Sequence, residues 1–169
     1  MKLALISLRD AKQLLDFELS NKQWFEQFIP PREDGFYCLE GVQAHIREFL
    51  LDYRCNQLVP LLIKDTDNKI IGRINVSNID TKRRIGHLGY RVGQASINQG
   101  VAKWAVEQLA TYIQGKSVDT LYAYAATNNP ASQKVLTGSG FESVKVVHNY
   151  AELNGEMIDC IEYRLRINS

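Results

Sequence analysis

A change of pattern near residue 93 constrains the fold of this chain more than any other feature. Alternating residues from Ile85 to Val92 predict a strand, and the polar stretch from Gly93 to Gly100 predicts a loop. Apolar residues then recur at helical spacing from Ala102 to Ile113, until Gly115 ends the helix. The order of strand, glycine-containing loop and helix places the amino terminus of a helix beside the end of a strand.

Strand and helix patterns surround this unit on both sides. Further strand patterns cover residues 3–8, 58–63, 70–79, 120–126, 141–150 and 157–167, and helical patterns cover 10–28, 42–53 and 129–138. Asp10 is placed to cap the first helix, with Gln13 three residues on. Asn154 and Gly155, between the last two strands, are typical of a tight hairpin turn.

The patterns predict one α/β domain over residues 1–169, with a mixed sheet of about six to seven strands flanked by helices. No internal repeat or linker divides the chain. In the strand at 70–79, Ile74 and Val76 alternate with Arg73 and Asn75, which is typical of a half-buried strand. Arg73 is therefore expected on the polar side.

Composition excludes several classes of protein. Lys and Arg total 20 against 19 for Asp and Glu, so the net charge of +1 gives no general attraction to nucleic acids or anionic membranes. Three widely spaced cysteines form neither a disulfide framework nor a metal-ligand pattern. No apolar run approaches the roughly 20 residues that span a bilayer, and the first ten residues are typical of a strand rather than a signal peptide. We expect a cytoplasmic protein without a metal.

The loop before the helix at 102–113 is a candidate anion site. A helix amino terminus presents unpaired N–H groups and a partial positive charge, so it can hold a phosphate without many basic side chains. Gly100 allows the backbone to come close to the anion, and Ala102 keeps the first turn free of bulk. Taken alone, the pattern is equally compatible with an ordinary strand-to-helix loop.

Two segments of this region together resemble the GNAT superfamily of N-acetyltransferases. They are Leu88 to Val92 and Ile97 to Ala102. The family pattern is Gln or Arg, two residues, Gly, one residue, then Gly or Ala. This chain keeps Gly100 and Ala102 but has Ile97 in place of the polar first residue and Asn98 where a further glycine is common.

A second motif strengthens the resemblance. Asn129 and Ser132, followed by Gly140 and Phe141, are similar to the family's Asn-x-x-Ser helix and its Gly-Phe exit. In the family the Asn bonds the pantetheine arm and the Ser lies close to the CoA sulfur. The alternative is local, since Asn129 is a good helix cap and Ser132 lies in the first turn.

Both ends of the chain resemble the branch of ribosomal-protein N-terminal (serine/alanine) acetyltransferases. Leu153 to Gly155, with Asp159 and Tyr163, is similar to the hairpin ending of that branch. Trp24 to Phe28, with the prolines and the arginine at 30–32, is similar to its first helix and acceptor-side loop. The resemblance therefore covers nearly the whole chain.

The resemblance implies acetyl transfer from acetyl-CoA to a primary amine by direct attack in a ternary complex, with no metal. A splayed parallel pair of strands is expected to hold acetyl-CoA. The residues implied in binding it are Tyr90, Arg91, Val92, Ile97, Asn98, Gln99, Gly100, Val101, Ala102, Asn129 and Ser132. Ser132 is also expected to protonate or hydrogen-bond the departing sulfur.

The base that accepts the amine proton has three candidates. His87 occupies the strand position at which histone-type members place a glutamate, and an imidazole can take up a proton near neutral pH. Glu152, beside the hairpin turn, is the second candidate, and an ordered water is the third. A histidine that simply pairs across the sheet and a solvated turn glutamate are the structural alternatives.

The acceptor is the N-terminal amine of a protein, ribosomal by resemblance, in the leading hypothesis. Trp24, Phe36 and Tyr37 are candidates to contact it, although aromatic residues at such spacing are more often core. A small amine such as a polyamine, amino acid or aminoglycoside is the second hypothesis, and a non-catalytic acyl-CoA-binding module is the third. The chain is compatible with a monomer or a homodimer.

Overall fold

Seven strands form one mixed sheet in the computed structural model, which describes residues 1–167. The strands lie in the order β1-β2-β3-β4-β5-β7-β6, and each neighbouring pair is antiparallel except β4 and β5, which are parallel. Their bounds are β1 Lys2–Leu5, β2 Val59–Lys64, β3 Ile70–Asp80, β4 Ile85–Val92, β5 Thr120–Ala126, β6 Glu142–Leu153 and β7 Glu156–Arg166. The predicted mixed sheet is confirmed.

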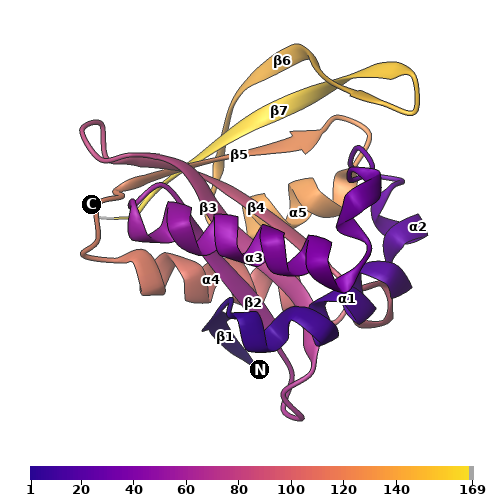
Figure 1. The fold of residues 1–169 in the computed structure, drawn as a ribbon. Coiled ribbons are helices and arrows are strands. Elements are labelled where there is room, and N and C mark those ends of the chain that lie inside the picture. The colour runs from indigo at the N-terminus through magenta and orange to yellow at the C-terminus, as the bar shows by residue number, and fades with distance from the viewer. Residues whose placement is uncertain (168–169) are drawn as a thin grey trace.

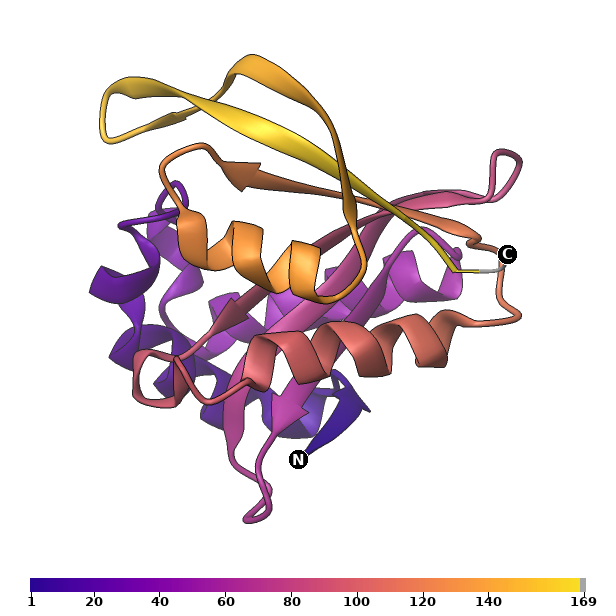
Figure 2. The same ribbon diagram turned by 180° about the vertical axis from the view of Figure 1, so that it is seen from behind.

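Helices cover both faces of the sheet. One face carries α1 (Ala11–Ser20), α2 (Lys22–Phe25) and α3 (Leu39–Arg54), whereas α4 (Val101–Ile113) and α5 (Pro130–Gly138) lie on the other, as Figures 1 and 2 show from opposite sides. Three short 3-10 helices, η1 (Leu8–Asp10), η2 (Asp34–Phe36) and η3 (Gln94–Ser96), occupy loops. The molecule is therefore a three-layer α/β/α arrangement.

Each face of the sheet has its own apolar core because side chains alternate along a strand. In β2, Leu61 and Ile63 pack with α4, whereas Leu62 between them packs with α1 and α3. The core under α4 is the larger and includes Leu109 and Leu121, both fully buried. Burial on both faces explains why β2 is apolar from Val59 to Ile63 without alternation.

The parallel strands β4 and β5 pair over only half of their length. Their register runs from Ile85 opposite Thr120 to Leu88 opposite Ala123 and ends there. Beyond this point β4 continues to Val92 and remains paired with β3 on its other side. The expected splayed parallel pair is thus present, and one edge of the backbone after Leu88 is free of the parallel ladder.

The helix predicted over residues 10–28 is interrupted. It divides at Asn21, where α1 ends and α2 begins. The Asn21 amide donates to the Phe17 carbonyl at 2.9 Å, and its oxygen accepts from the Gln94 backbone N–H at 2.8 Å. Asn21 therefore ties the helix end to the loop after β4, a contact between residues 73 positions apart that helical periodicity does not reveal.

The predicted cap at Asp10 is wrong. Its carboxylate makes no capping bond to α1 and instead accepts from the Ser7 backbone N–H at 2.9 Å and from Lys64 Nζ at 2.7 Å. Gln13 does not take part in a helix cap either, since its side-chain oxygen accepts from the Ile70 backbone N–H at 3.1 Å. A buried lysine at the end of β2 attracts the carboxylate more strongly than a helix end does. The first strand accordingly stops at Leu5 rather than continuing to Leu8.

Candidate active site

The last six residues of β4 carry different side chains on the two faces of the sheet. His87, Gly89 and Arg91 point toward the layer of α1–α3, whereas Leu88 and Tyr90 point toward α4 and α5. Gly89 is exposed, and a Cβ built there meets no atom within 4 Å. The strand therefore has an open position between a histidine and an arginine.

Tyr90 connects β4 to the first turn of α5. Its hydroxyl lies 3.0 Å from the Ser132 hydroxyl, and the Asn129 side chain accepts from the Ser132 backbone N–H at 3.2 Å. Burial raises the pKa of Tyr90 above its ordinary value of 10.0, so its hydroxyl stays protonated as a donor. The three residues that the sequence singled out from separate motifs thus lie together. Asn129 caps α5, as its local alternative predicts.

The loop before α4 has the backbone of an anion site. Asn98 and Gly100 both have positive φ, at 58° and 74°, and Gly100 is the residue that precedes the helix. The first helical N–H with an intrahelical partner in this turn belongs to Trp104, which bonds the Gly100 carbonyl. A Cβ at Gly100 meets nothing within 4 Å. The open space and the helix amino terminus fit a phosphate group.

The other predicted residues of this loop surround that turn. Ile97 follows η3 in extended conformation, and Gln99 is exposed and donates to the Ala95 carbonyl at 3.1 Å. Val101 is buried at the start of α4 and Ala102 is half-buried beside it. The loop therefore directs backbone groups, and no basic side chain, toward the open space. Pyrophosphate binding there would depend on N–H groups and the helix dipole.

His87 is half-buried on β4. Its Nδ1 atom has no hydrogen-bond partner within residues 1–167, and neither has the Oδ1 atom of Asn75 on the neighbouring strand. The imidazole contacts two tyrosines of β5 in stacked orientation, with ring centroids 5.9 Å from Tyr122 and 6.1 Å from Tyr124. A buried ring nitrogen without a hydrogen-bond partner costs free energy and is uncommon.

A row of aromatic rings continues from His87 across β5 to β6, and sequence reasoning did not select its further members Tyr124 and Tyr150 or their neighbour Glu162. Tyr150 of β6 stacks on Tyr124 at 4.7 Å, and the Tyr124 hydroxyl donates to Glu162 of β7 at 2.9 Å. Burial and that bond raise the pKa of Tyr124 to about 12. Only strand register could have found the set, since β5 and β7 pair Tyr124 with Glu162.

Glu152, the second candidate base, lies at the outer end of the β6-β7 hairpin. It is exposed and stands opposite Met157, one pair before the turn at Asn154 and Gly155. Both turn residues have positive φ, at 52° and 80°, which confirms the predicted hairpin turn. Figure 1 shows this hairpin projecting beyond the rest of the sheet. Glu152 is thus only two residues beyond Tyr150 on β6, at the exposed end of the hairpin.

The three aromatic candidates for acceptor contact lie in the layer of α1–α3. Phe36 is buried in the core at 9% exposure, beneath the guanidinium of Arg32 at 4.2 Å. Trp24 is half-buried with its ring edge-to-face on Phe28, and Tyr37 lies beneath the ammonium of Lys22 at 4.7 Å. Trp24 and Tyr37 therefore keep accessible surface, whereas Phe36 mainly supports its neighbours.

A buried charge cluster on the same face was missed by sequence reasoning. Glu18 of α1, 1% exposed, accepts from Arg73 at 2.8 Å, Arg32 at 2.9 Å and Arg91 at 3.3 Å. Burial raises the pKa of Glu18, but the charges of Arg73, Arg91 and Arg32 outweigh it and hold the pKa below 4.5. Arg73 also bonds His45 Nε2 at 2.7 Å. Arg73, expected on the polar side of a half-buried strand, is therefore buried, because Glu18 supplies a counter-charge.

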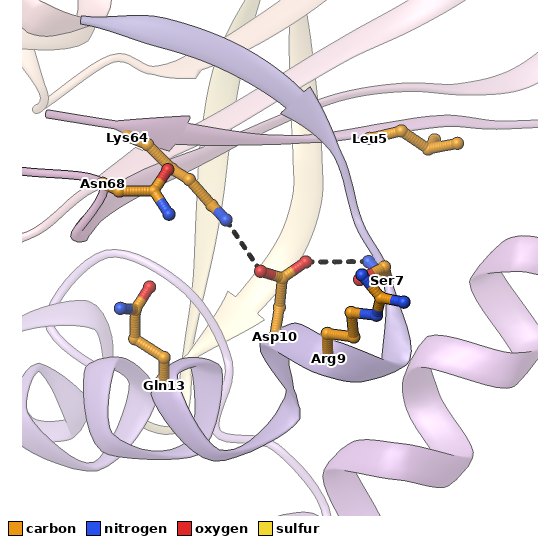
Figure 3. A pocket seen from close by; sticks show the side chains of 7 residues that line it. All are labelled: Leu5, Ser7, Arg9, Asp10, Gln13, Lys64 and Asn68. Carbon is orange, nitrogen blue, oxygen red and sulfur yellow. Dashed lines mark hydrogen bonds and ion pairs between the residues drawn. The ribbon is translucent and has the colours of Figure 1, made fainter. Parts of the chain in front are cut away.

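A pocket on the surface lies away from these groups. It is lined by residues at the end of β2 and around η1, among them Asp10, Gln13 and Lys64, with the Lys64–Asp10 ion pair at its centre (Figure 3). The lysine and aspartate neutralise each other, and no buried unpartnered atom of residues 1–167 lies among its lining residues. The chemistry of the chain is concentrated at β4 instead.

The comparisons with known proteins agree with this geometry. Residues 1–142 match the family model described as an acetyltransferase (GNAT) domain. The chain belongs to the GNAT acetyltransferase family. GNAT members named among its relatives are N-acetyltransferases, so the chain is an enzyme of that class. A relative in Escherichia coli, the alanine N-acetyltransferase of ribosomal protein uS5, is 25% identical over 92% of this chain and 81% of its own.

Two solved structures share the fold of this GNAT chain. The ribosomal-protein-S5-alanine acetyltransferase of Vibrio fischeri has a TM-score of 0.93 at 23% identity, over 98% of this chain and 92% of its own. A ribosomal L7/L12 α-N-protein acetyltransferase, solved with coenzyme A, has a TM-score of 0.90 at 19% identity, over 97% and 92%. Within residues 1–167 we find no helix long and apolar enough to cross a membrane.

Proposed function

We propose that this GNAT enzyme transfers the acetyl group of acetyl-CoA to the N-terminal amine of a protein, with ribosomal proteins as the first acceptors to test. One observation carries the proposal: the pairing of β4 and β5 ends at Leu88, and polar groups lie on both faces of β4 at this point. Tyr90 and Ser132 lie on one face, and His87 lies on the other. A donor and an acceptor could reach the same strand end from opposite faces. The names of two relatives support the acceptor class.

Acetyl-CoA would supply an activated thioester. The loop at Asn98 and Gly100 would hold its pyrophosphate through backbone N–H groups, since the space beside Gly100 is open. The freed backbone of β4 after Leu88 would bond the pantetheine arm and polarise the carbonyl oxygen. Asn129 would contact the arm from α5. These residues fit the group without a metal ion.

The acceptor amine would attack the thioester carbon directly in the ternary complex. A new N–C bond forms as the C–S bond breaks, and the amine must lose one proton while the thiolate gains one. His87, a half-buried imidazole on the face of β4 opposite Tyr90, would take up the amine proton, directly or through water. Ser132, bonded to the buried Tyr90 hydroxyl, would donate to the departing sulfur. No acyl-enzyme is needed.

Titration with acetyl-CoA by calorimetry, followed by an assay of thiol release, tests the proposal. The acceptor panel holds peptides that begin with serine or alanine, the same peptides with a blocked amino terminus, and small amines such as a polyamine and an aminoglycoside. We expect saturable binding and thiol release with the free peptides alone. Release only with small amines would favour the second hypothesis, and binding without release would favour a non-catalytic module.

A further inference from the structure

The cluster of Arg32, Arg73 and Arg91 around Glu18 has more positive than negative charges. Three guanidinium groups share a single carboxylate. His45 adds no charge at neutral pH, because burial and the neighbouring Arg73 lower its pKa to about 3. The cluster therefore has two excess positive charges on the acceptor side of the sheet.

The charged side chains that act on Arg91 are Glu18, Arg32 and Arg73, and Glu18 is the only acidic one among them. Lys22 adds a further positive charge above Tyr37, and Glu26 acts on Tyr37 from the other end of α2. Glu162 is bonded to Tyr124, beyond His87. Charge near Arg91 is therefore positive, which opposes binding of a polyamine or an aminoglycoside there.

Access to the three arginines differs. The Arg73 side chain is 4% exposed and is enclosed by Glu18 and His45, whereas the side chains of Arg91 and Arg32 are 25% and 19% exposed. Arg91 bonds Glu18 through one nitrogen at 3.3 Å, the longest of the three ion pairs. A guanidinium has five N–H donors, so Arg91 has donors left for an incoming anion. Arg73 holds Glu18, and Arg91 is the group that a ligand can reach.

The surroundings of Arg91 suit a peptide. Gly89 leaves open space two residues away on the same face, which corresponds to roughly 7 Å along the strand. An amine seated between His87 and Gly89 would therefore place the side chain of the next one or two peptide residues at Arg91. The amine and the carboxylate of a single free amino acid lie closer together than that.

We infer that Arg91, together with Arg32, binds the carboxylate of an acidic side chain at the second or third position of the acceptor peptide. The inference rests on the proposed function and narrows its substrate. Two arginines beside a shared carboxylate form charge-assisted bonds with a planar anion, and a partly buried setting strengthens them. The subsite would select acceptors by charge before the amine reaches His87.

The test compares peptides that differ only in charge. Peptides with Asp at position 2 or 3 are compared with the matching Asn peptides and with free aspartate, by kcat/KM and by calorimetric Kd in the presence of CoA. We expect the wild type to prefer an Asp peptide at least tenfold in both measurements. The Arg91→Gln variant should reduce that ratio to near one, and Arg91→Lys should retain part of it because it keeps the charge but not the planar fork.

Arg83→Gln is the matched control, because its side chain is 79% exposed in the turn after β3 and pairs only weakly with Asp80 at 3.9 Å. It should keep the wild-type ratio. Equal kcat/KM and equal Kd for Asp and Asn peptides in the wild type would overturn the subsite, as would a preference that Arg91→Gln leaves intact. Free aspartate as the better acceptor would overturn the peptide assignment.

The binding measurement separates this inference from the proposed function. If acetyl-CoA releases no thiol with any peptide, yet the Asp peptide binds tenfold more tightly than the Asn peptide and Arg91→Gln abolishes the difference, the subsite stands and the transfer reaction does not. If acetyl-CoA releases thiol equally fast with both peptides, the transfer reaction stands and the subsite does not.

Discussion

Arg73 and Arg91 lie directly opposite each other on β3 and β4, and both donate to the one carboxylate of Glu18. Two like charges at such a cross-strand position repel each other unless a counter-charge lies between them. Glu18, which comes from α1, therefore joins a helix to the sheet at the strand that carries the candidate site. The same arrangement makes the stability of the fold depend on a carboxylate 55 positions before Arg73.

Replacement of Glu18 by Gln should strongly destabilise the fold. The change leaves Arg73 buried among like charges without a counter-charge, and breaking a buried pair in this way costs about 3–5 kcal/mol. Urea unfolding followed by circular dichroism measures the effect. Glu48→Gln on the exposed face of α3 is the control and should change the free energy of unfolding by less than about 0.5 kcal/mol. Similar losses in both variants would contradict the counter-charge role.

His45 should make stability fall as the pH falls below neutrality. In the unfolded chain an imidazole takes up a proton near its ordinary value of 6.5, whereas burial and Arg73 lower the pKa of His45 to about 3 in the fold. The unfolded state thus binds more protons between these values, and stability is lost from about pH 6.5 downward. The loss between pH 7 and pH 5 is about 2 kcal/mol.

Urea midpoints measured at pH 7, 6 and 5 check this dependence. His45→Gln keeps an acceptor for Arg73 but does not titrate, so its midpoint should change much less over the same range. The range lies above the lowered pKa of Glu18, which loses its contribution only at more acidic pH. An equally steep dependence in His45→Gln would assign the effect to another group.

Replacement of Ser132 by Ala should lower kcat at least tenfold while it changes the Kd for acetyl-CoA by less than threefold. Its hydroxyl lies against Tyr90 and would serve the departing sulfur, so its loss acts on the reaction more than on binding. Single-turnover kinetics and calorimetry give the two values. Ser139→Ala, at the other end of α5, is the control, because its hydroxyl has no hydrogen-bond partner in residues 1–167.

Replacement of His87 by Gln should lower kcat by about 10²–10⁴, the range typical of general acid–base groups. His148→Gln is a matched control, because that imidazole is 77% exposed on β6 and pairs with Asp159. Glu152→Gln separates the two candidate bases. A full rate in His87→Gln together with a large loss in Glu152→Gln would transfer the role to the hairpin, and full rates in both would leave it to water.

Replacement of Gly100 by Ala should weaken acetyl-CoA binding at least fivefold. The new methyl group occupies open space beside the helix amino terminus. The φ of 74° at residue 100 adds about 1 kcal/mol of strain for a residue with a Cβ. Gly115→Ala at the other end of α4 has nearly the same φ, 77°, and equally open surroundings, so it carries the strain without the site. Calorimetric Kd values for acetyl-CoA test this prediction. Equal Kd values for the two variants would contradict a phosphate site at Gly100.

Local patterns predicted the elements around the site closely. The bounds of β4 and β5 agree with those expected from alternation alone, since each strand is short and glycine or charged turns bound it. Tyr90 and Ser132 were selected from two separate motifs, whereas the contact between their hydroxyls is known only from the tertiary structure. Asn21 was missed because its effect on α1 arises from a bond to the loop after β4.

The sequence by itself determined the order of strand, loop and helix at residues 85–113 and the positive-φ turns at Gly100 and Asn154. It also determined which polar groups lie on β4 and α5. Each of these features follows from the conformational preference or the spacing of neighbouring residues. Only the tertiary structure decided which charges meet. Glu18, Arg32, Arg73 and Arg91 come from four separate segments, and their burial depends on helix packing and strand register. Such long-range pairing leaves no periodic signal along the chain.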